Sequence, residues 1–426
     1  MLYLCQYLLG EEMKNVIKIS LATAVIMSVG SISAQAADNG ISIFDNVKVK
    51  GEVRPRYEMV DEENTKANAN ALTNRLVLGV KADLFGTDWL STYVEMTDVH
   101  TVNDNYNSTD NGAGNSIVAD PEQKRVTQAY LDFNLNKTKL RVGRQMMNID
   151  NLRFIGAVAW RQMPQTYDAY SLIDNTVKDL NLFASYVYQR NSIFAGSKND
   201  GLKDTDSVFL NAKYKVSDKL TVTGYGYLIG STHDTYGVAL TGKVPVSENL
   251  KLNYRAEYAM QTDASMETAS KGKPNADASY MNLELGMNMS GVLAGLNYEV
   301  LSGDGGGDET AFTTPYATAH KFNGWADKFL GTPGDGLVDA NVMVGYKSKS
   351  FGVAKAIYHD FSSDVGSKDY GTELDLIYKS TIPGVKGLTG MLKYADFSSD
   401  NSGATLTGGD VDTQKFWAML DYKFSN

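Results

Sequence analysis

The chain is 426 residues long and acidic, with 40 Lys and Arg against 50 Asp and Glu and a formal net charge of −10. This balance, without a basic patch interleaved with aromatic residues, argues against a nucleic-acid partner. The chain has one cysteine, Cys5, and no apolar run long enough for a helix that spans a bilayer.

The first 36 residues are predicted to be a secretory signal peptide that is cut after Ala36. A basic segment (13–18) precedes an apolar core (19–32) and the small-residue sequence Ala34-Gln35-Ala36. Serine and glycine interrupt the apolar core, which is shorter than the roughly 20 residues of a membrane anchor. Residues 1–12 fit poorly before this signal, so Met13 is an alternative start. The mature chain, 37–426, is then a single domain without cysteine or disulfide bonds.

The pattern of β-strands begins soon after this signal. In residues 47–59 apolar side chains alternate with charged ones, so one face of the segment is apolar and the other is charged. The same period of two recurs in 75–81, 250–258 and 415–424. Across the chain about 18 such segments follow, each with roughly the 9 to 11 residues that a tilted membrane strand needs. No helical period competes with this pattern, so the chain is predicted to be all-β.

The connections between these segments alternate in length. Short turns are expected at 85–88, 136–137, 174–178, 217–218, 245–249, 290–291, 348–350 and 382–386. The other connections are mostly longer and polar, at 61–71, 100–124, 147–165, 191–204, 262–277, 302–336 and 398–410, with modest ones near 230–234 and 361–368. The alternation predicts a transmembrane antiparallel up-and-down β-barrel with both termini in the periplasm. A secreted β-sandwich, the alternative, would have Greek-key crossovers.

The charged strand faces are predicted to line a wet lumen, because a barrel of this width is too wide for side chains to fill. Strand parity directs more basic than acidic residues inward, whereas the loops hold most of the acidic excess. The candidates for the pore lining and constriction lie on strands or in segments that could fold inward: Arg54, Arg56, Arg75, Arg141, Arg144, Arg153, Arg161, Arg255, Glu52 and Asp132. In the alternative interpretation, inward acidic residues neutralise these arginines.

Several motifs carry a family resemblance. They are Arg75-Leu76-Val77-Leu78-Gly79, Glu95-Met96-Thr97-Asp98, Arg141-Val142-Gly143-Arg144-Gln145, Trp160-Arg161-Gln162 and Tyr358-His359-Asp360-Phe361, together with longer stretches at 141–169 and 320–329. These motifs resemble the alginate export family of outer-membrane barrels. The resemblance implies an 18-stranded, monomeric barrel with an arginine-rich constriction that passes an anionic polyuronate. It does not fix the cargo, because one fold serves different solutes.

These features predict a porin-like outer-membrane channel whose arginine-rich lumen favours passive diffusion of anionic solutes. The main alternative is a dedicated exporter of alginate or another anionic polysaccharide, and a remote one is a barrel enzyme. The histidines are scattered, and His359 and Asp360 should point to opposite faces of a strand, so no catalytic residue and no cofactor are expected. The expected partners are these solutes and the outer-membrane lipids of a Gram-negative bacterium, which the chain reaches through the Sec route.

The long connection at 302–336 supports two further hypotheses. Asp304, Asp308 and Glu309 are weak candidates for a calcium site, although a solvated loop without a metal is the favoured interpretation. The aromatic residues between Phe312 and Phe329 are unusual for a solvated loop. We therefore expect this segment to fold over or into the mouth of the barrel as a gate.

Overall fold

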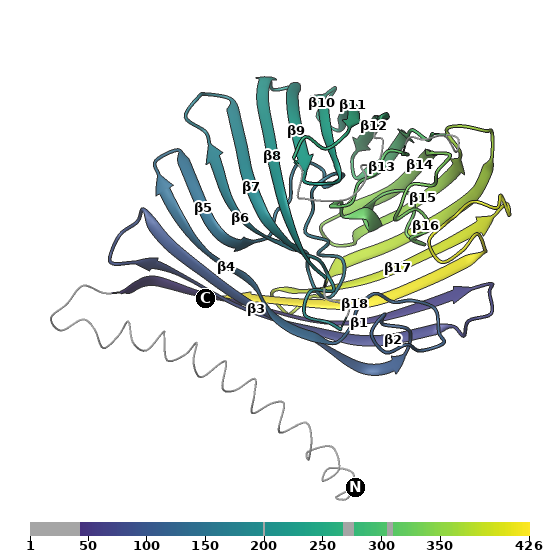
Figure 1. The fold of residues 1–426 in the computed structure, drawn as a ribbon, viewed down its shortest axis with the longest axis horizontal. Helices are drawn as coiled ribbons and strands as arrows, with labels where there is room; N and C mark the ends of the chain where they lie inside the picture. The colour runs from purple at the N-terminus through teal and green to yellow at the C-terminus, as the bar shows by residue number, and fades with distance from the viewer. Residues whose placement is uncertain (1–42, 199–200, 267–276, 305–309) are drawn as a thin grey trace, which may run out of the picture.

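In a computed structural model, which describes residues 43–198, 201–266, 277–304 and 310–426, the chain forms an 18-stranded sheet that closes on itself (Figure 1). The strands are β1 (Phe44–Glu62), β2 (Ala69–Leu84), β3 (Leu90–Asn105), β4 (Gln123–Leu135), β5 (Thr138–Gln145), β6 (Thr166–Asp174), β7 (Leu180–Asn191), β8 (Leu202–Ser217), β9 (Leu220–Ile229), β10 (His233–Pro245), β11 (Leu250–Thr262), β12 (Asp277–Met289), β13 (Val292–Leu301), β14 (Leu337–Ser348), β15 (Gly352–Ser362), β16 (Asp369–Thr381), β17 (Leu388–Ser399) and β18 (Thr413–Ser425). The predicted signal peptide and the alternative start at Met13 lie outside the described residues.

Each strand pairs antiparallel with the next one along the chain, and β1 pairs with β18 to close the barrel. The closing register runs from Lys50 opposite Ser425 to Glu62 opposite Thr413. The last residue extends this seam, because the backbone N–H of Val49 donates to Oδ1 of Asn426 at 2.7 Å. The predicted up-and-down barrel is therefore confirmed, and no sheet edge is left open.

The connections alternate in length as predicted. Short turns join β2–β3, β4–β5, β6–β7, β8–β9, β10–β11, β12–β13, β14–β15 and β16–β17, and the beginning of β1 lies at the same end of the barrel as these turns. We call this the short-turn end, and we call the opposite end the long-loop end. Among the described residues, no helix is long and apolar enough to cross a membrane, and the 3₁₀ helix η2 (Ala319–Lys321) spans three residues.

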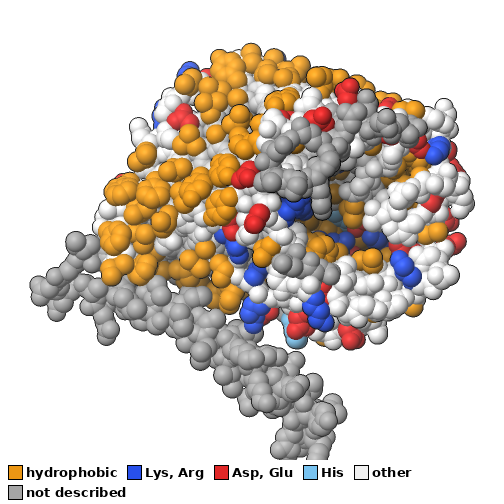
Figure 2. All heavy atoms as spheres, viewed as in Figure 1, with side chains coloured by type: hydrophobic (Ala, Val, Ile, Leu, Met, Phe, Trp, Pro, Cys, Tyr) orange, Lys and Arg blue, Asp and Glu red, His pale blue; other side chains and the backbone are white. Residues whose placement is uncertain are grey.

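The two faces of the wall separate by strand parity. On β10, Tyr236, Val238 and Leu240 are exposed on the outside, whereas Thr235 and Ala239 are buried on the inside. Other strands repeat this pattern, with tyrosines such as Tyr186, Tyr258 and Tyr298 on the outer face. Figure 2 shows hydrophobic side chains spread over the outer wall and Lys and Arg side chains inside the central hollow. An apolar outer surface on a closed barrel is the surface that lipid requires.

Candidate functional site

The middle of the barrel is filled by two loops that fold inward. One is the β5–β6 loop (146–165), and the other is the β13–β14 loop (302–336), of which 302–304 and 310–336 are described. Their aromatic side chains pack on aromatic side chains of the wall: Phe154 and Phe312 lie 5.4 and 5.5 Å from the ring of Tyr280, and Phe329 lies 4.5 Å from the ring of Phe361. The described part of segment 302–336 therefore folds into the barrel, as expected.

The two inward loops are also bonded to one another. The N–H of Gly156 donates to the carbonyl of Tyr316 at 2.9 Å, and the N–H of Thr318 donates to the carbonyl of Leu152 at 3.1 Å. A Cβ atom on Gly156 would lie only 2.2 Å from Oγ1 of Thr318. Glycine at this position therefore permits the close approach of the loops, and they form one plug.

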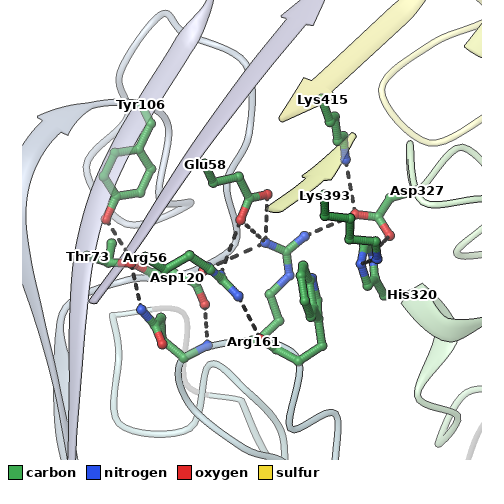
Figure 3. Close-up of polar contacts among 12 residues, drawn as sticks. Arg56, Glu58, Thr73, Tyr106, Asp120, Arg161, His320, Asp327, Lys393 and Lys415 are labelled. Carbon is green, nitrogen blue, oxygen red and sulfur yellow. Dashed lines mark hydrogen bonds and ion pairs between the residues drawn. The ribbon is translucent and has the colours of Figure 1, made fainter. Parts of the chain in front are cut away.

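A network of three cations and three carboxylates fastens this plug to the wall (Figure 3). Arg161 of the β5–β6 loop lies 3.2 Å from Glu58 on β1 and 3.1 Å from Asp327 of the β13–β14 loop. The remaining members are Arg56 on β1, Asp120 in the β3–β4 loop and Lys415 on β18, which contact Glu58, Arg56 and Asp327, respectively. Buried charges need such partners.

Asp327 is the carboxylate that links the plug to β18. Burial alone would raise the pKa of the Asp327 carboxyl, but His320, Lys415 and Arg161 outweigh burial and hold this pKa well below its usual value. Burial lowers the pKa of His320 to about 3. A neutral His320 ring then donates from Nδ1 to Asp327 at 2.5 Å and accepts from Lys393 at Nε2, at 2.7 Å.

Lys393 on β17 lies among three tryptophan rings. Its Nζ atom is 3.7 Å from the ring centroid of Trp325, 4.3 Å from that of Trp160 and 5.2 Å from that of Trp417. Trp160 belongs to the β5–β6 loop, Trp325 to the β13–β14 loop, and Trp417 to β18. Cation–π contacts in a dry site stabilise by about 2 kcal/mol, so this one lysine attaches both loops to the wall.

The other predicted lumen arginines also have partners. Arg54 donates to the carbonyls of Ala159 and Arg161 at 3.0 and 2.7 Å, and Glu52 lies 3.7 and 3.4 Å from Arg54 and Arg75. Arg153 pairs with Glu299 at 3.0 Å, Arg255 with Glu257 at 2.7 Å, and Arg141 with Asp132 at 2.7 Å. The arginines thus fasten inward loops and neighbouring strands, as in the alternative interpretation of the sequence.

Arg144 lies apart from this network. It has the same strand parity as Val142, and it pairs with Asp168 at 2.7 Å, close to the outward Tyr188. The structure therefore brings Arg144 to the outer side of the wall near the long-loop end instead of the lumen, because one residue along a strand reverses the face.

A cavity of about 630 Å³ remains between the plug and the wall from β9 to β15. Its cations include Lys243, Lys321 and Lys355, and none of these has an ion pair among the described residues. Glu299 and Asp339 also line the cavity, but they are paired with Arg153 and His359, respectively. Glu284 is the acidic lining residue without an ion pair in the described part of the chain. Unpaired charge in the cavity is therefore mostly positive.

Sequence reasoning missed several members of this site. Asp120 and Asp327 are loop residues whose partners follow only from the way the loops fold inward. Lys393 could have been found, because it has the same strand parity as Met391 and Ala395 and so shares their inward face. The residues Asp308 and Glu309 of the calcium hypothesis lie outside the described residues, and no cluster of three or more metal ligands occurs among the residues that are described. His359 contacts Asp339 at 2.8 Å.

Comparison with known proteins is consistent with this arrangement. The profile described as "Alginate export" matches residues 45–328. Among solved structures, Acinetobacter baumannii OccAB2 (TM-score 0.71, 14% identity, 91% of this chain and 100% of the other) and OccAB3 (0.70, 14%, 89% and 100%) share the fold. So does Pseudomonas aeruginosa OpdK, solved with vanillate (0.69, 13%, 90% and 100%). A search of curated proteins found no match.

A closed 18-stranded antiparallel wall, an apolar outer surface and a plugged polar lumen define a porin-like β-barrel of the outer-membrane class. The profile match covers well over half of the chain. The protein therefore belongs to the alginate export family.

Proposed function

We propose that the protein is a passive channel for anionic solutes in the outer membrane of a Gram-negative bacterium. The observation that carries this proposal is the cavity beside the plug, where the unpaired charges are mostly lysines. Fixed positive charge in a low-dielectric wall raises the local concentration of anions. The protein would act as a monomer, exported through the Sec route by the signal in residues 1–36, with the short-turn end and both termini in the periplasm.

A dedicated exporter of alginate or another anionic polysaccharide is the second candidate. The family match favours it, because this chain belongs to a family described by that activity. In both candidates the plug lies in the path of the solute. The two inward loops must therefore move aside before a solute can pass. Neither candidate involves bond chemistry, and the family and the similar structures are of the channel type.

Electrical recording from the purified barrel in a planar bilayer tests the channel. We would measure conductance and the reversal potential across a salt gradient, for the native chain and for a variant in which residues 312–330 are replaced by a short Gly-Ser linker. The variant should conduct several-fold more, because it lacks Phe312, His320, Trp325 and Asp327. Both proteins should prefer chloride to potassium.

The matched control replaces residues 109–115, the tip of the β3–β4 loop, with the same linker. This tip lies away from the aromatic packing of the plug, so the conductance should stay close to that of the native chain. Preference for cations in both proteins would contradict the proposal. Unchanged conductance in the 312–330 variant would contradict the gating role of that segment.

A further inference from the structure

The hydrogen-bonded ladder that closes the barrel is interrupted at one point. The first and last strands, β1 and β18, lie side by side along this seam (Figure 1). Their register runs without a shift, but the pairs that would join Arg54 to Asp421 and Pro55 to Leu420 are missing. Proline has no N–H to donate across a strand pair. The seam is therefore weaker at Pro55 than on either side of it.

An open groove of about 570 Å³ lies on the outer face of the wall over this gap. Its floor includes two small outward residues, Gly390 on β17 and Ala418 on β18. Gly390 lies opposite Leu420, and Ala418 lies opposite Leu392, so small and large side chains alternate across the two strands. The remaining apolar residues of the groove are Pro55, Tyr57, Leu72, Tyr378, Ile382, Pro383 and Met419.

The groove is polar at the end that adjoins the short turns. Ser350 of the β14–β15 turn lines it there, together with Ser380 and Thr381 at the end of β16. Tyr378 holds the β14–β15 turn against the wall, because its hydroxyl donates to the carbonyl of Phe351 at 2.8 Å. The groove thus offers hydroxyl groups near the short-turn end and apolar side chains toward the middle of the wall.

Two lysines lie on the turns that bound this polar end. Lys349 directly precedes Ser350, and Lys386 lies in the β16–β17 turn, which contributes Ile382 and Pro383 to the groove. Both lysines are exposed, neither turn contains an acidic residue, and neither lysine forms an ion pair with the described residues. The groove therefore ends at a cationic, hydroxyl-bearing rim.

We infer that this groove binds one anionic phospholipid, with an acyl chain along its apolar floor and the phosphate at Lys349, Lys386 and the neighbouring hydroxyl groups. Hydrocarbon fills any hollow on a wall that faces lipid, so the cationic rim decides which lipid is selected. A second barrel is a poorer occupant, because a two-fold contact would bring like-charged turns together. The bound lipid would cover the gap at Pro55 and stabilise the closed barrel. This inference does not depend on which solute the channel passes.

Native mass spectrometry of the purified barrel tests this inference. The barrel is released from a neutral detergent that contains equal amounts of phosphatidylglycerol and phosphatidylcholine with the same acyl chains. The first retained lipid should be phosphatidylglycerol about tenfold more often than phosphatidylcholine, because two lysines contact its net negative charge. The preference should shrink as the salt concentration is raised.

Two variants address the two ends of the lipid. Lys349→Gln with Lys386→Gln should remove the preference for phosphatidylglycerol. Its matched control, Lys137→Gln with Lys178→Gln, changes net charge equally on two other short turns and should keep the preference.

The second variant, Ala418→Phe, fills the floor of the groove and should reduce retention of the first lipid several-fold. Its matched control is Ala184→Phe, which adds the same ring to the outer face of β7, between Leu182 and Tyr186. This control should retain the lipid as the native barrel does.

Thermal unfolding in nanodiscs, followed by circular dichroism, provides a second measurement. The midpoint of the native barrel should rise by a few degrees when part of the phosphatidylcholine is replaced by phosphatidylglycerol, because a ligand that binds only the folded state stabilises it. The lysine variant and Ala418→Phe should lose this rise, and their two controls should show it.

The outcomes are distinct from those that test the channel. Equal retention of the two lipids by the native barrel overturns the inference, as does a preference that persists in the lysine variant. Unchanged lipid retention by Ala418→Phe also overturns it. Dimers that the native barrel forms and Ala418→Phe does not would assign the groove to a second copy instead. Ion selectivity of either sign leaves the lipid site standing.

Discussion

At the scale of residues, the plug is held by buried charges whose pairing is nearly complete. Arg161 contacts Glu58, Asp120 and Asp327, and each of these carboxylates also contacts a second cation or a histidine. Removing one partner from such a group leaves an uncompensated charge in a dry place, which costs more than the ion pair itself contributes. The network therefore acts as a fastener that a single substitution can release.

The substitution Asp327→Asn should release the plug from the wall. Lys415 loses its carboxylate while Arg161 keeps Glu58, so the attached state should weaken by about 3 kcal/mol, the low end for a broken buried pair. The open probability of the channel in planar bilayers should then rise roughly 100-fold. Asp335→Asn is the control, since Asp335 in the same loop pairs with the exposed Lys368. An unchanged open probability in Asp327→Asn would mean that the network does not hold the plug.

The protonation of His320 should make the plug sensitive to acid. In the attached plug, burial lowers the pKa of His320 to about 3, whereas a released loop should have the ordinary value near about 6.5. The ring faces Asp327, Lys393, Arg161, Trp160 and Trp417. Because the released loop binds the extra proton, attachment is strongest above pH ~6.5 and weakens about tenfold for each pH unit below it, down to about 3.

The measurement is the labelling rate of Ala317→Cys, a buried plug position, relative to the exposed Gly331→Cys, both in a Cys5→Ser background. The ratio should rise as the pH falls from 7 to 5. His320→Gln should remove this rise, while His100→Gln, which changes an exposed histidine, should keep it. A ratio that is flat with pH in the native sequence would contradict the buried neutral ring.

At the scale of elements, the two inward loops depend on one another. Gly156 and Thr318 touch so closely that a side chain on residue 156 has no room, and the adjacent backbone hydrogen bonds follow from that approach. Each loop also brings one tryptophan to Lys393. The loops should therefore open as a pair.

The substitution Gly156→Ala should separate the two inward loops. The new Cβ would lie 2.2 Å from Oγ1 and 3.0 Å from the backbone N of Thr318, and relief of such a clash costs about 1 to 3 kcal/mol. Conductance recordings should show about tenfold more frequent openings, and adding Thr318→Ala should reverse part of the effect. Gly114→Ala is the matched control, because a Cβ at that glycine meets nothing within 4 Å. Equal behaviour of the two glycine variants would refute the paired opening.

At the scale of the whole molecule, the wall should be stable without the plug. All 18 strands pair with two neighbours, so the wall satisfies its own backbone groups within lipid. Replacing 312–330 with a linker should shift the thermal midpoint of the barrel, followed by circular dichroism, by only a few degrees.

Gly143→Val is the comparison for this experiment. Residue 143 has a φ of +124°, and a Cβ there would lie 2.3 Å from the carbonyl oxygen of Ala129. The substitution therefore distorts the strands of the wall. It should lower the thermal midpoint or the folded yield far more than the loop replacement does. A barrel that unfolds when the loop is replaced would show that the plug and the wall form one cooperative unit.

The sequence alone determined the wall. Alternation with a period of two is a local property, and it was enough to predict the strands, their number, the closed barrel, the alternating connections and the inward face of Arg54, Arg56, Arg75 and Arg255. Arg144 was a candidate for the lumen only because it lies at the end of a strand, next to a loop that could fold inward, and the structure places it on the outer face instead.

Only the tertiary structure decided what these charges contact. Arg56 meets Asp120 across 64 positions, Arg153 meets Asn323 across 170, and Arg161 meets Asp327 across 166. Such pairs depend on how far each loop folds into the lumen, which no local pattern records. The three tryptophan rings around Lys393 likewise form one site only when two loops and two strands come together. Periodicity is set by neighbouring residues, whereas pairing is set by the path of the whole chain.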